Sequence, residues 1–410
     1  MKKSLLRKYA KLAVRSGVNV QKGQILVINA EANAYEFVRL CTEEAYKAKA
    51  KKVVVNFSDE EVTHQTYLHC SKETLSEFPD YIYQQRKYYQ DQGCCFLSII
   101  SSTPGLMSDV DVEKVAAYRK VASKKMEPLR KYTMNNIGQW CIVSLPTVAW
   151  AKMVFPQLSD KKALEALWKA VLDAVMVNDS TNPVKVWKDH SAKLKRYCDI
   201  LNDYHFDKLH FTNSLGTDLY VQLVKKHIWV GGSSISEKKV EFNPNMPTEE
   251  VFCMPQLDGV NGVVYASKPL NFSGKLIKDF SLTFKDGKVI EHHAKVNQDL
   301  LTTLLDSDEG SRRLGEVALI SYNSPISLSN ILFYETLFDE NASCHLALGD
   351  SYPENMEGGL MMDEEQLKAN GANSSSIHVD FMFGSEDMEV VGIKPDGSEV
   401  AIFHNGNFVF

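Results

Sequence analysis

Short apolar runs alternate with segments of helical periodicity in the first third of the chain. Four runs have the length and composition of buried strands: 24–30, 52–57, 95–101 and 139–145. One segment with helical spacing precedes the first run, at 5–14, and two others lie between runs, at 34–50 and 80–90. A basic amphipathic helix is predicted from Val112, broken or kinked at Pro128. Strands separated by helices in this order indicate βαβ units and a mostly parallel sheet.

The pattern changes at about Leu209. Short strand-like runs follow one another with turn signals between them, at 218–223, 228–232, 262–267 and 280–284. Two tetrapeptides, 285–288 with Asp-Gly and 404–407 with Asn-Gly, have the composition of hairpin turns. Helices are predicted at 298–305 and around 311–317. This half of the chain is therefore predicted to be α+β with a mainly antiparallel sheet.

A chain of 410 residues is too long for one comfortable core, so two domains are expected. Helical segments at 163–176 and 184–201 lead out of the first pattern and into the second. We place a soft boundary near residue 190. Residues 1–190 are then an α/β domain, and residues 191–410 an α+β domain that carries the chemistry. The first domain has no catalytic set of its own, and we expect it to control access and to support dimerisation.

Charge and cysteine content narrow the class of protein. The formal net charge is -6, which argues against nucleic acid or an anionic membrane as the main partner. The basic stretch 112–131 is interpreted as a solvated face or a subunit contact. No apolar stretch approaches the roughly eighteen residues of a membrane span, and no secretory leader is recognisable. The eight cysteines contain no C-x-x-C pair and fit a reducing compartment. A cytoplasmic protein is expected.

Familiar motifs are missing from the chain. The turn after the first apolar run, 31–34, contains no glycine, so a dinucleotide or phosphate-binding loop is not expected there. No G-x-S-x-G elbow occurs, and Cys344 beside His345 is interpreted as a packed thiol. The neighbouring His292 and His293 are interpreted as polar residues at the end of a strand.

Hard metal ligands and imidazoles are concentrated in the second half of the chain. They are Glu249, Glu250, Glu316, Glu340, His345, His378 and Asp380. On a strand, residues two apart face the same side, so His378 and Asp380 would point at one place. The same residues can equally be the solvent face of a sheet, an ordinary polar loop, or, for Glu316, the surface of a helix. Residue types and spacing alone leave metal binding undecided.

Longer strings of residues resemble the thermophilic-type bacterial aminopeptidases, the aminopeptidase T, AmpS and PepS group. The matching strings are 150–151, 154–156, 245–252 (NMPTEEVF), 258–262 (DGVNG), 313–316 (RLGE), 337–349 (LFDENASCHLALG) and 377–382 (IHVDFM). They occur in the family's order along essentially the whole chain. One departure follows Met254-Pro255, where Gln256 and Leu257 replace the basic or His-containing residues frequent in the family. That departure bears on substrate side-chain preference.

The resemblance implies a cytosolic, homodimeric aminopeptidase that hydrolyses the N-terminal residue from peptides with a water activated by two divalent metal ions. The implied metal ligands are Glu250, Glu316, Glu340, His345, His378 and Asp380. Glu316 would bridge the ions, Glu340 and His345 would complete one, and His378 with Asp380 the other. Tyr352 would donate a hydrogen bond to the oxyanion, and Glu249 is a candidate general base. The ligand types suit Zn, Co or Mn and also admit Mg.

Two other functions remain open from the residues. A two-metal phosphoesterase or deacetylase would use the same ligands on substrates that lack a free α-amine. A non-catalytic peptide-binding protein would retain no metal after dialysis. Both alternatives make predictions that a substrate panel and a metal assay can separate.

Overall fold

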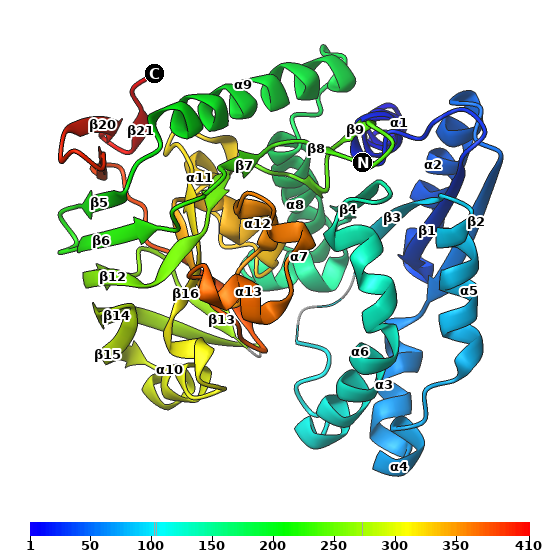
Figure 1. The fold of residues 1–410 in the computed structure, drawn as a ribbon. Coiled ribbons are helices and arrows are strands. Elements are labelled where there is room, and N and C mark those ends of the chain that lie inside the picture. The colour runs from blue at the N-terminus through cyan, green and yellow to red at the C-terminus, as the bar shows by residue number, and fades with distance from the viewer. Residues whose placement is uncertain (102, 104, 273) are drawn as a thin grey trace. The chain divides into compact units, whose positions relative to one another are not determined.

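The structure, a computed structural model, describes residues 1–410 apart from 102, 104 and 273. It divides the chain into two compact units, coloured along the chain in Figure 1. The first unit contains Met1–Asp189 and Ser233–Pro247, and the second contains His190–Gly232 and Thr248–Phe410. The segment 233–247 thus returns to the first unit after the chain has entered the second, which a single boundary near residue 190 does not describe.

The first unit is built on a parallel sheet with the order β10-β4-β3-β1-β2. Its strands are β1 (Ile25–Glu31), β2 (Lys52–Ser58), β3 (Cys95–Ile100), β4 (Trp140–Ser144) and β10 (Asn245–Met246). The predicted α/β architecture is therefore confirmed. The fifth strand, β10, comes from the returning segment, and a small pair, β8 (Ser234–Ile235) and β9 (Glu241–Phe242), precedes it.

Most helices of the first unit coincide with the segments for which the spacing of apolar residues predicted a helix. They are α1 (Lys3–Leu12), α2 (Tyr35–Lys47), α3 (Glu60–His69), α4 (Lys72–Leu75), α5 (Asp80–Asp91), α6 (Val112–Met134), α7 (Val148–Val154), α8 (Asp160–Ala174) and, crossing into the second unit, α9 (Pro183–Tyr204). The short helices α3, α4 and α7 were not predicted. Helix α6 also runs through Pro128 and is not broken there. The turn beyond the proline is held by tertiary packing, because Leu129 and Tyr132 are buried and Tyr132 Oη donates to Cys94 O at 2.6 Å.

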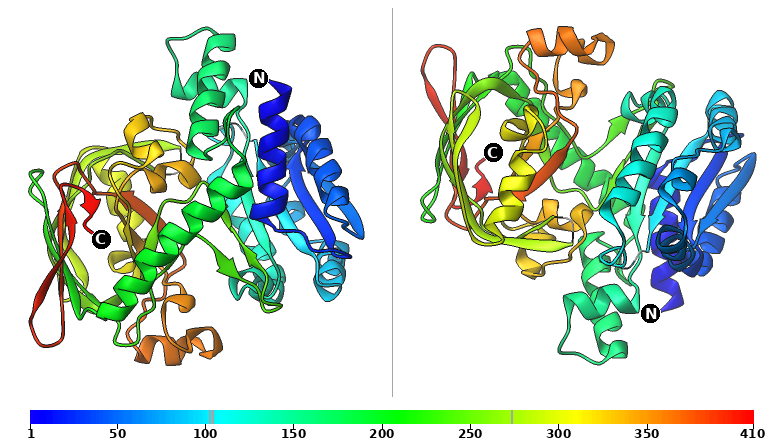
Figure 2. Two further views of the ribbon diagram at one scale, coloured as in Figure 1. Left: turned by 90° about the horizontal axis from the view of Figure 1, so that it is seen from above. Right: turned by 90° about the horizontal axis from the view of Figure 1, so that it is seen from below.

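The second unit contains two antiparallel sheets. The larger has the order β13-β14-β12-β6-β5-β19-β20-β21, with β15 paired to β14. Its strands are β5 (Lys208–Thr212), β6 (Asp218–Leu223), β12 (Pro255–Tyr265), β13 (Leu270–Phe272), β14 (Lys275–Lys285), β15 (Lys288–Val296), β19 (Glu389–Ile393), β20 (Glu399–His404) and β21 (Asn407–Phe408). Figure 2 shows the red C-terminal strands beside the green strand β5, and β19 pairs with β5 directly. The predicted α+β class is confirmed.

The smaller sheet has the order β18-β17-β16-β11-β7. Its strands are β7 (Val230–Gly231), β11 (Val251–Cys253), β16 (Leu314–Leu319), β17 (His345–Gly349) and β18 (His378–Met382). Helices α10 (Gln298–Leu305), α11 (Pro325–Ser329), α12 (Thr336–Asp339) and α13 (Glu364–Ala369) complete the unit. The two sheets share one hydrophobic core, to which Leu282 of the larger and Val317 of the smaller both belong.

Both predicted hairpin turns are confirmed. Asp286 and Gly287 join β14 to β15 with positive φ at both residues, 48° and 77°. Asn405 and Gly406 join β20 to β21 in the same way, at 49° and 71°. Two central residues with positive φ define the turn type whose twist matches that of paired strands.

The helix predicted around 311–317 is wrong. A single 3₁₀ turn at Gly310–Arg312 leads into strand β16, whose six residues are all buried. The apolar residues of this segment fit either period, and pairing decides between them, because β16 is hydrogen-bonded on both sides, to β11 and to β17. Glu316 consequently lies inside a sheet and not on a helix surface.

Candidate metal centre

The smaller sheet sends alternate residues to opposite faces. Directly paired residues on neighbouring strands project from the same face. One row runs across all five strands: Val230, Phe252, Ala318, His345 and Met382. The next row contains Glu316, Ala347 and Asp380. The row after it contains Gly349 and His378. The acidic and imidazole side chains of three strands therefore share one face.

The opposite face of this sheet is hydrophobic core. Its residues alternate along each strand with those of the ligand-bearing face and pack in the core of the unit. They include Cys253, Val317, Leu346 and Phe381. A shift of one residue in register would exchange the two faces. The predicted placement of His378 and Asp380 on one side of a strand agrees with β18, and the core on the other face explains why these polar residues are fixed on this one.

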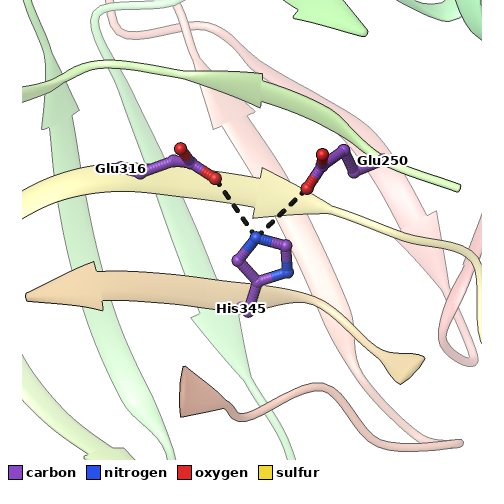
Figure 3. A group of neighbouring side chains, drawn as sticks. All are labelled: Glu250, Glu316 and His345. Carbon is purple, nitrogen blue, oxygen red and sulfur yellow. Dashed lines mark hydrogen bonds and ion pairs between the residues drawn. The ribbon is translucent and has the colours of Figure 1, made fainter. Parts of the chain in front are cut away.

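The first group of possible ligands consists of Glu250, Glu316 and His345. His345 is 1% exposed, and its Nε2 lies 3.2 Å from Glu250 Oε2 and 3.1 Å from Glu316 Oε1. Both carboxylates point at this nitrogen, one from the residue before β11 and one from β16 (Figure 3). One atom from each residue lies within 4.8 Å of the others, close enough to hold one ion together.

The second group consists of Glu316, His378 and Asp380. His378 Nε2 is 3.6 Å from Glu316 Oε2 and 3.4 Å from Asp380 Oδ1. The other ring nitrogen, Nδ1, donates to the carbonyl oxygen of Asp350 at 2.8 Å. Because a carbonyl only accepts, this contact places the proton on Nδ1 and turns Nε2 toward the carboxylates. Glu316 belongs to both groups and contributes a different oxygen to each.

The carboxylates of the two groups act on the protonation of both histidines. Burial alone would lower the pKa of both histidines, but the neighbouring carboxylates outweigh it. They raise the pKa of His345 well above its usual value, through Glu250 and Glu316, and the pKa of His378 to about 10, chiefly through Asp380. Burial raises the pKa of Glu316. The carboxylates thus favour the protonated, cationic form of both imidazoles, and the site attracts positive charge.

Glu340 and Tyr352 interact with the charges of these groups, but Glu340 is a member of neither group. Glu340 begins a 3₁₀ turn (Glu340–Ala342), and burial together with the charges of Asp380 and Glu250 raises its pKa well above the usual value. The Tyr352 ring packs against His378 with centroids 4.6 Å apart. Burial and the charges of Glu316 and Asp380 raise the pKa of Tyr352, so its hydroxyl remains protonated and can donate.

Glu249 contacts His190 of helix α9 and Asn341. Its amide donates to Asn341 Oδ1 at 2.7 Å, and its Oε2 lies 3.9 Å from His190 Nε2. Within the described residues its Oε1 is buried with no hydrogen-bond partner. Burial raises the pKa of Glu249 to about 8. Glu249 belongs to neither ligand group, although it directly precedes Glu250.

The site fits divalent metal ions. Among the residues that the structure describes, His345 Nδ1 and Asp380 Oδ1 are buried without a hydrogen-bond partner. Buried polar atoms without partners cost free energy, and several buried carboxylates brought together cost more. Divalent cations bound between them would offset both costs, and mixed carboxylate and imidazole ligands are the type that Zn, Co and Mn accept.

Sequence reasoning missed the residues that hold the second group in place. Asp308 accepts hydrogen bonds from the Ser375 hydroxyl (2.8 Å) and the Ser376 amide (2.6 Å), just before His378. These contacts help to hold the pKa of Asp308 at about 2. Asn373 Nδ2 donates to Gly310 O and Gly349 O at 2.8 and 2.6 Å. No local pattern marks these residues, since their partners lie more than twenty positions away.

The fold and the site together define a two-unit protein whose second unit carries a carboxylate and imidazole centre for divalent metal. The chain belongs to the thermophilic metalloprotease family (M29), whose model matches residues 2–408. It is therefore a metalloprotease, a hydrolase of peptide bonds. The resemblance noted in the sequence is confirmed.

Several aminopeptidases align with nearly the whole length of the chain. Aminopeptidase AmpS of Bacillus subtilis (strain 168) is 45% identical over 405 residues, which are 99% of this chain and 98% of that protein. Aminopeptidase T of Thermus thermophilus is 36% identical over 404 residues, 98% of each. The solved structure of wild-type AmpT from Thermus thermophilus superimposes with a TM-score of 0.92 over 100% of both chains at 36% identity. In the described part of this chain, no helix combines the length and apolarity that a membrane crossing requires.

Proposed function

We propose that this metalloprotease is an aminopeptidase that removes the N-terminal residue from peptides with the help of two divalent ions. The observation that carries the proposal is the shared carboxylate of Glu316, whose two oxygens point at two different imidazoles. A carboxylate between two terminal ligand sets is what a pair of ions requires. The names of the relatives, all aminopeptidases, support the restriction to the first residue.

The six candidate ligands divide into two sets around Glu316. Glu250, Glu340 and His345 would hold one ion, and His378 and Asp380 the other. Four carboxylates and two neutral imidazoles carry a charge of about -4, which two divalent cations would balance. Zn, Co, Mn and Mg are all compatible with these ligand types. A second ion is favoured over a single one because His378 and His345 contact different oxygens of Glu316.

The ions would supply Lewis acidity and would lower the pKa of a bound water, which would then serve as the nucleophile at neutral pH. Tyr352 would donate a hydrogen bond from its hydroxyl to the oxyanion that forms on the attacked carbonyl. Glu249, with one buried oxygen lacking a partner among the described residues, is the candidate acceptor of the proton of the water. The acidic side chains of the site would bind the free α-amine of the substrate, which limits hydrolysis to the first residue.

The variant Tyr352→Phe is expected to lower kcat about 10²- to 10³-fold with little change in metal content, because it removes one donor to the oxyanion. Steady-state kinetics on an aminoacyl p-nitroanilide, with metal analysis of both proteins, measures this effect. Loss of metal together with activity would instead indicate that the ring mainly supports His378. Near-normal turnover would remove Tyr352 from the catalytic residues.

The proposed function is tested by chelating the protein and adding back Zn, Co, Mn or Mg singly. Aminoacyl p-nitroanilides with a free amine should be hydrolysed again after metal addition, and their N-acetylated counterparts should not. A phosphoryl chromogenic substrate in the same panel tests the phosphoesterase alternative. Hydrolysis of acetylated or phosphoryl substrates alone, or no retained metal and no activity, would contradict an aminopeptidase.

We further propose a homodimer in the cytoplasm, with the first unit controlling access to the site and supporting dimerisation. The eight cysteines, which contain no C-x-x-C pair, support the compartment, and the resemblance supports the dimer. Sedimentation of the purified chain measures the oligomeric state directly.

A further inference from the structure

The face that carries the candidate ligands is not polar throughout. Phe252 lies on β11 two residues after Glu250, and it is paired directly with Ala318 of β16. Val230 of β7 is its partner on the other side. Both Phe252 and Val230 are only half-buried, whereas Cys253, which follows Phe252 and faces the core, is fully buried. An apolar, partly accessible area of two side chains therefore adjoins the ligands on the same face.

The Phe252 ring is held in a defined position. It packs edge-on against Tyr352 with centroids 6.1 Å apart, and Tyr352 in turn packs against His378. The backbone is fixed as well, because the buried Asn355 donates from Nδ2 to Phe252 O at 3.0 Å and to Ile228 O at 3.2 Å. A ring that is fixed before a ligand binds loses little entropy when one packs against it.

The neighbours of this ring toward the ligands are small. Ala318 lies between Phe252 and His345 in the same row, and Ala347 lies between Glu316 and Asp380 in the next. Both carry only a methyl group, so between Phe252 and the candidate ligands no large side chain projects from the paired positions of this face. The large apolar residue on the far side of the row, Met382, is buried.

In an N-terminal residue, one Cα is bonded to the α-amine, to the scissile carbonyl carbon and to the side chain. When amine and carbonyl are held at the ligands, the side chain must therefore lie within a few Å of them. We propose that Phe252, with Val230, receives this side chain and makes the enzyme select large apolar N-terminal residues such as leucine and phenylalanine. The inference rests on the proposed aminopeptidase function and adds the class of residue that is removed.

The test is kcat/KM for leucyl, phenylalanyl and alanyl p-nitroanilides, measured on the metal-loaded full chain and on its Phe252→Ala variant. Wild type should prefer the leucyl and phenylalanyl substrates over the alanyl one. In the variant this preference should fall about 10- to 100-fold, the range that one pocket contact with an apolar side chain supplies. Phe252→Leu should retain most of it, and Val230→Ala should reduce it more weakly.

Two controls separate a specificity role from a structural one. Tyr220→Ala removes an aromatic ring that is 39% exposed on β6 of the larger sheet, and it should leave the preference unchanged. Metal content and melting temperature of each variant show whether the site is intact. An equal loss on all three substrates, or a loss of metal in Phe252→Ala, would overturn the inference, since the ring would then only support Tyr352 and His378. No hydrolysis of any substrate by wild type would instead refute the proposed function, and this inference with it.

Discussion

Replacing Glu316 by glutamine is expected to abolish peptide hydrolysis and metal retention together. Oε1 of Glu316 lies 3.1 Å from His345 and Oε2 lies 3.6 Å from His378, so this one carboxylate serves both ligand groups. An amide keeps the size of the side chain but loses the charge and one of the two accepting oxygens. We expect kcat/KM to fall by about 10³-fold or more. Turnover of an aminoacyl p-nitroanilide and metal content after dialysis measure the two effects.

Thermal unfolding of the same variant distinguishes a lost ligand from a damaged fold. Without metal, Glu316→Gln should melt at the wild-type temperature or above it, because a buried carboxylate among other carboxylates costs free energy that an amide does not. Metal at 100 times its Kd should stabilise the wild type by about 2.7 kcal/mol and the variant by much less. Glu291→Gln, an exposed residue of β15, is the control for the same chemical change. Full metal retention with normal turnover in Glu316→Gln would exclude Glu316 as a ligand.

Gly349→Ala is expected to destabilise the second unit by about 3 kcal/mol or more. Gly349 ends β17, is paired with His378 and has a φ of 110°, a conformation that residues with a side chain rarely adopt. A Cβ at this position would lie far inside van der Waals contact of the Ile377 carbonyl oxygen. The β18 strand would have to move away from β17, and His378 and Asp380 would move with it. Urea unfolding, together with metal binding, measures the change.

Gly397→Ala isolates the contribution of backbone conformation to this result. Gly397 has a φ of 83°, and a Cβ there would have no atom within 4 Å. The Gly397→Ala substitution should therefore lower the free energy of unfolding by only about 1–2 kcal/mol, which is the conformational penalty for a residue with a side chain. If the two variants lost the same stability and Gly349→Ala bound metal normally, close approach of β17 and β18 would not be what Gly349 provides.

The local pattern of the chain predicted its elements well where one period dominates. The four apolar runs in the first third of the chain form β1, β2, β3 and β4, and Asp286 and Gly287 form a hairpin turn. Prediction failed where two periods fit equally, as at Glu316, and where packing compensated a local penalty, as at Pro128. Short helices such as α4, with four residues, offer too few turns for a period to be recognised.

The candidate ligands show a similar division. His378 and Asp380 are two positions apart, so their common direction follows from strand geometry alone. Glu250, Glu316 and His345 are separated by tens of residues, and nothing local states that they meet. The sequence strings that contain these three residues indicated a metal site only because they resemble those of a known family. Such a resemblance does not explain why the three residues meet in the fold.

By itself, the sequence determined the class of each half, the hairpin turns and the types of ligand available, because these depend on alternation and side-chain chemistry within a few residues. Only the tertiary structure decided that Glu316 lies in a buried strand between β11 and β17, that its two oxygens face two imidazoles, and that Glu249 contacts His190. The physical reason is register. Pairing between strands far apart in the chain selects which face each residue occupies, and the hydrophobic core on one face leaves the other to the carboxylates and imidazoles.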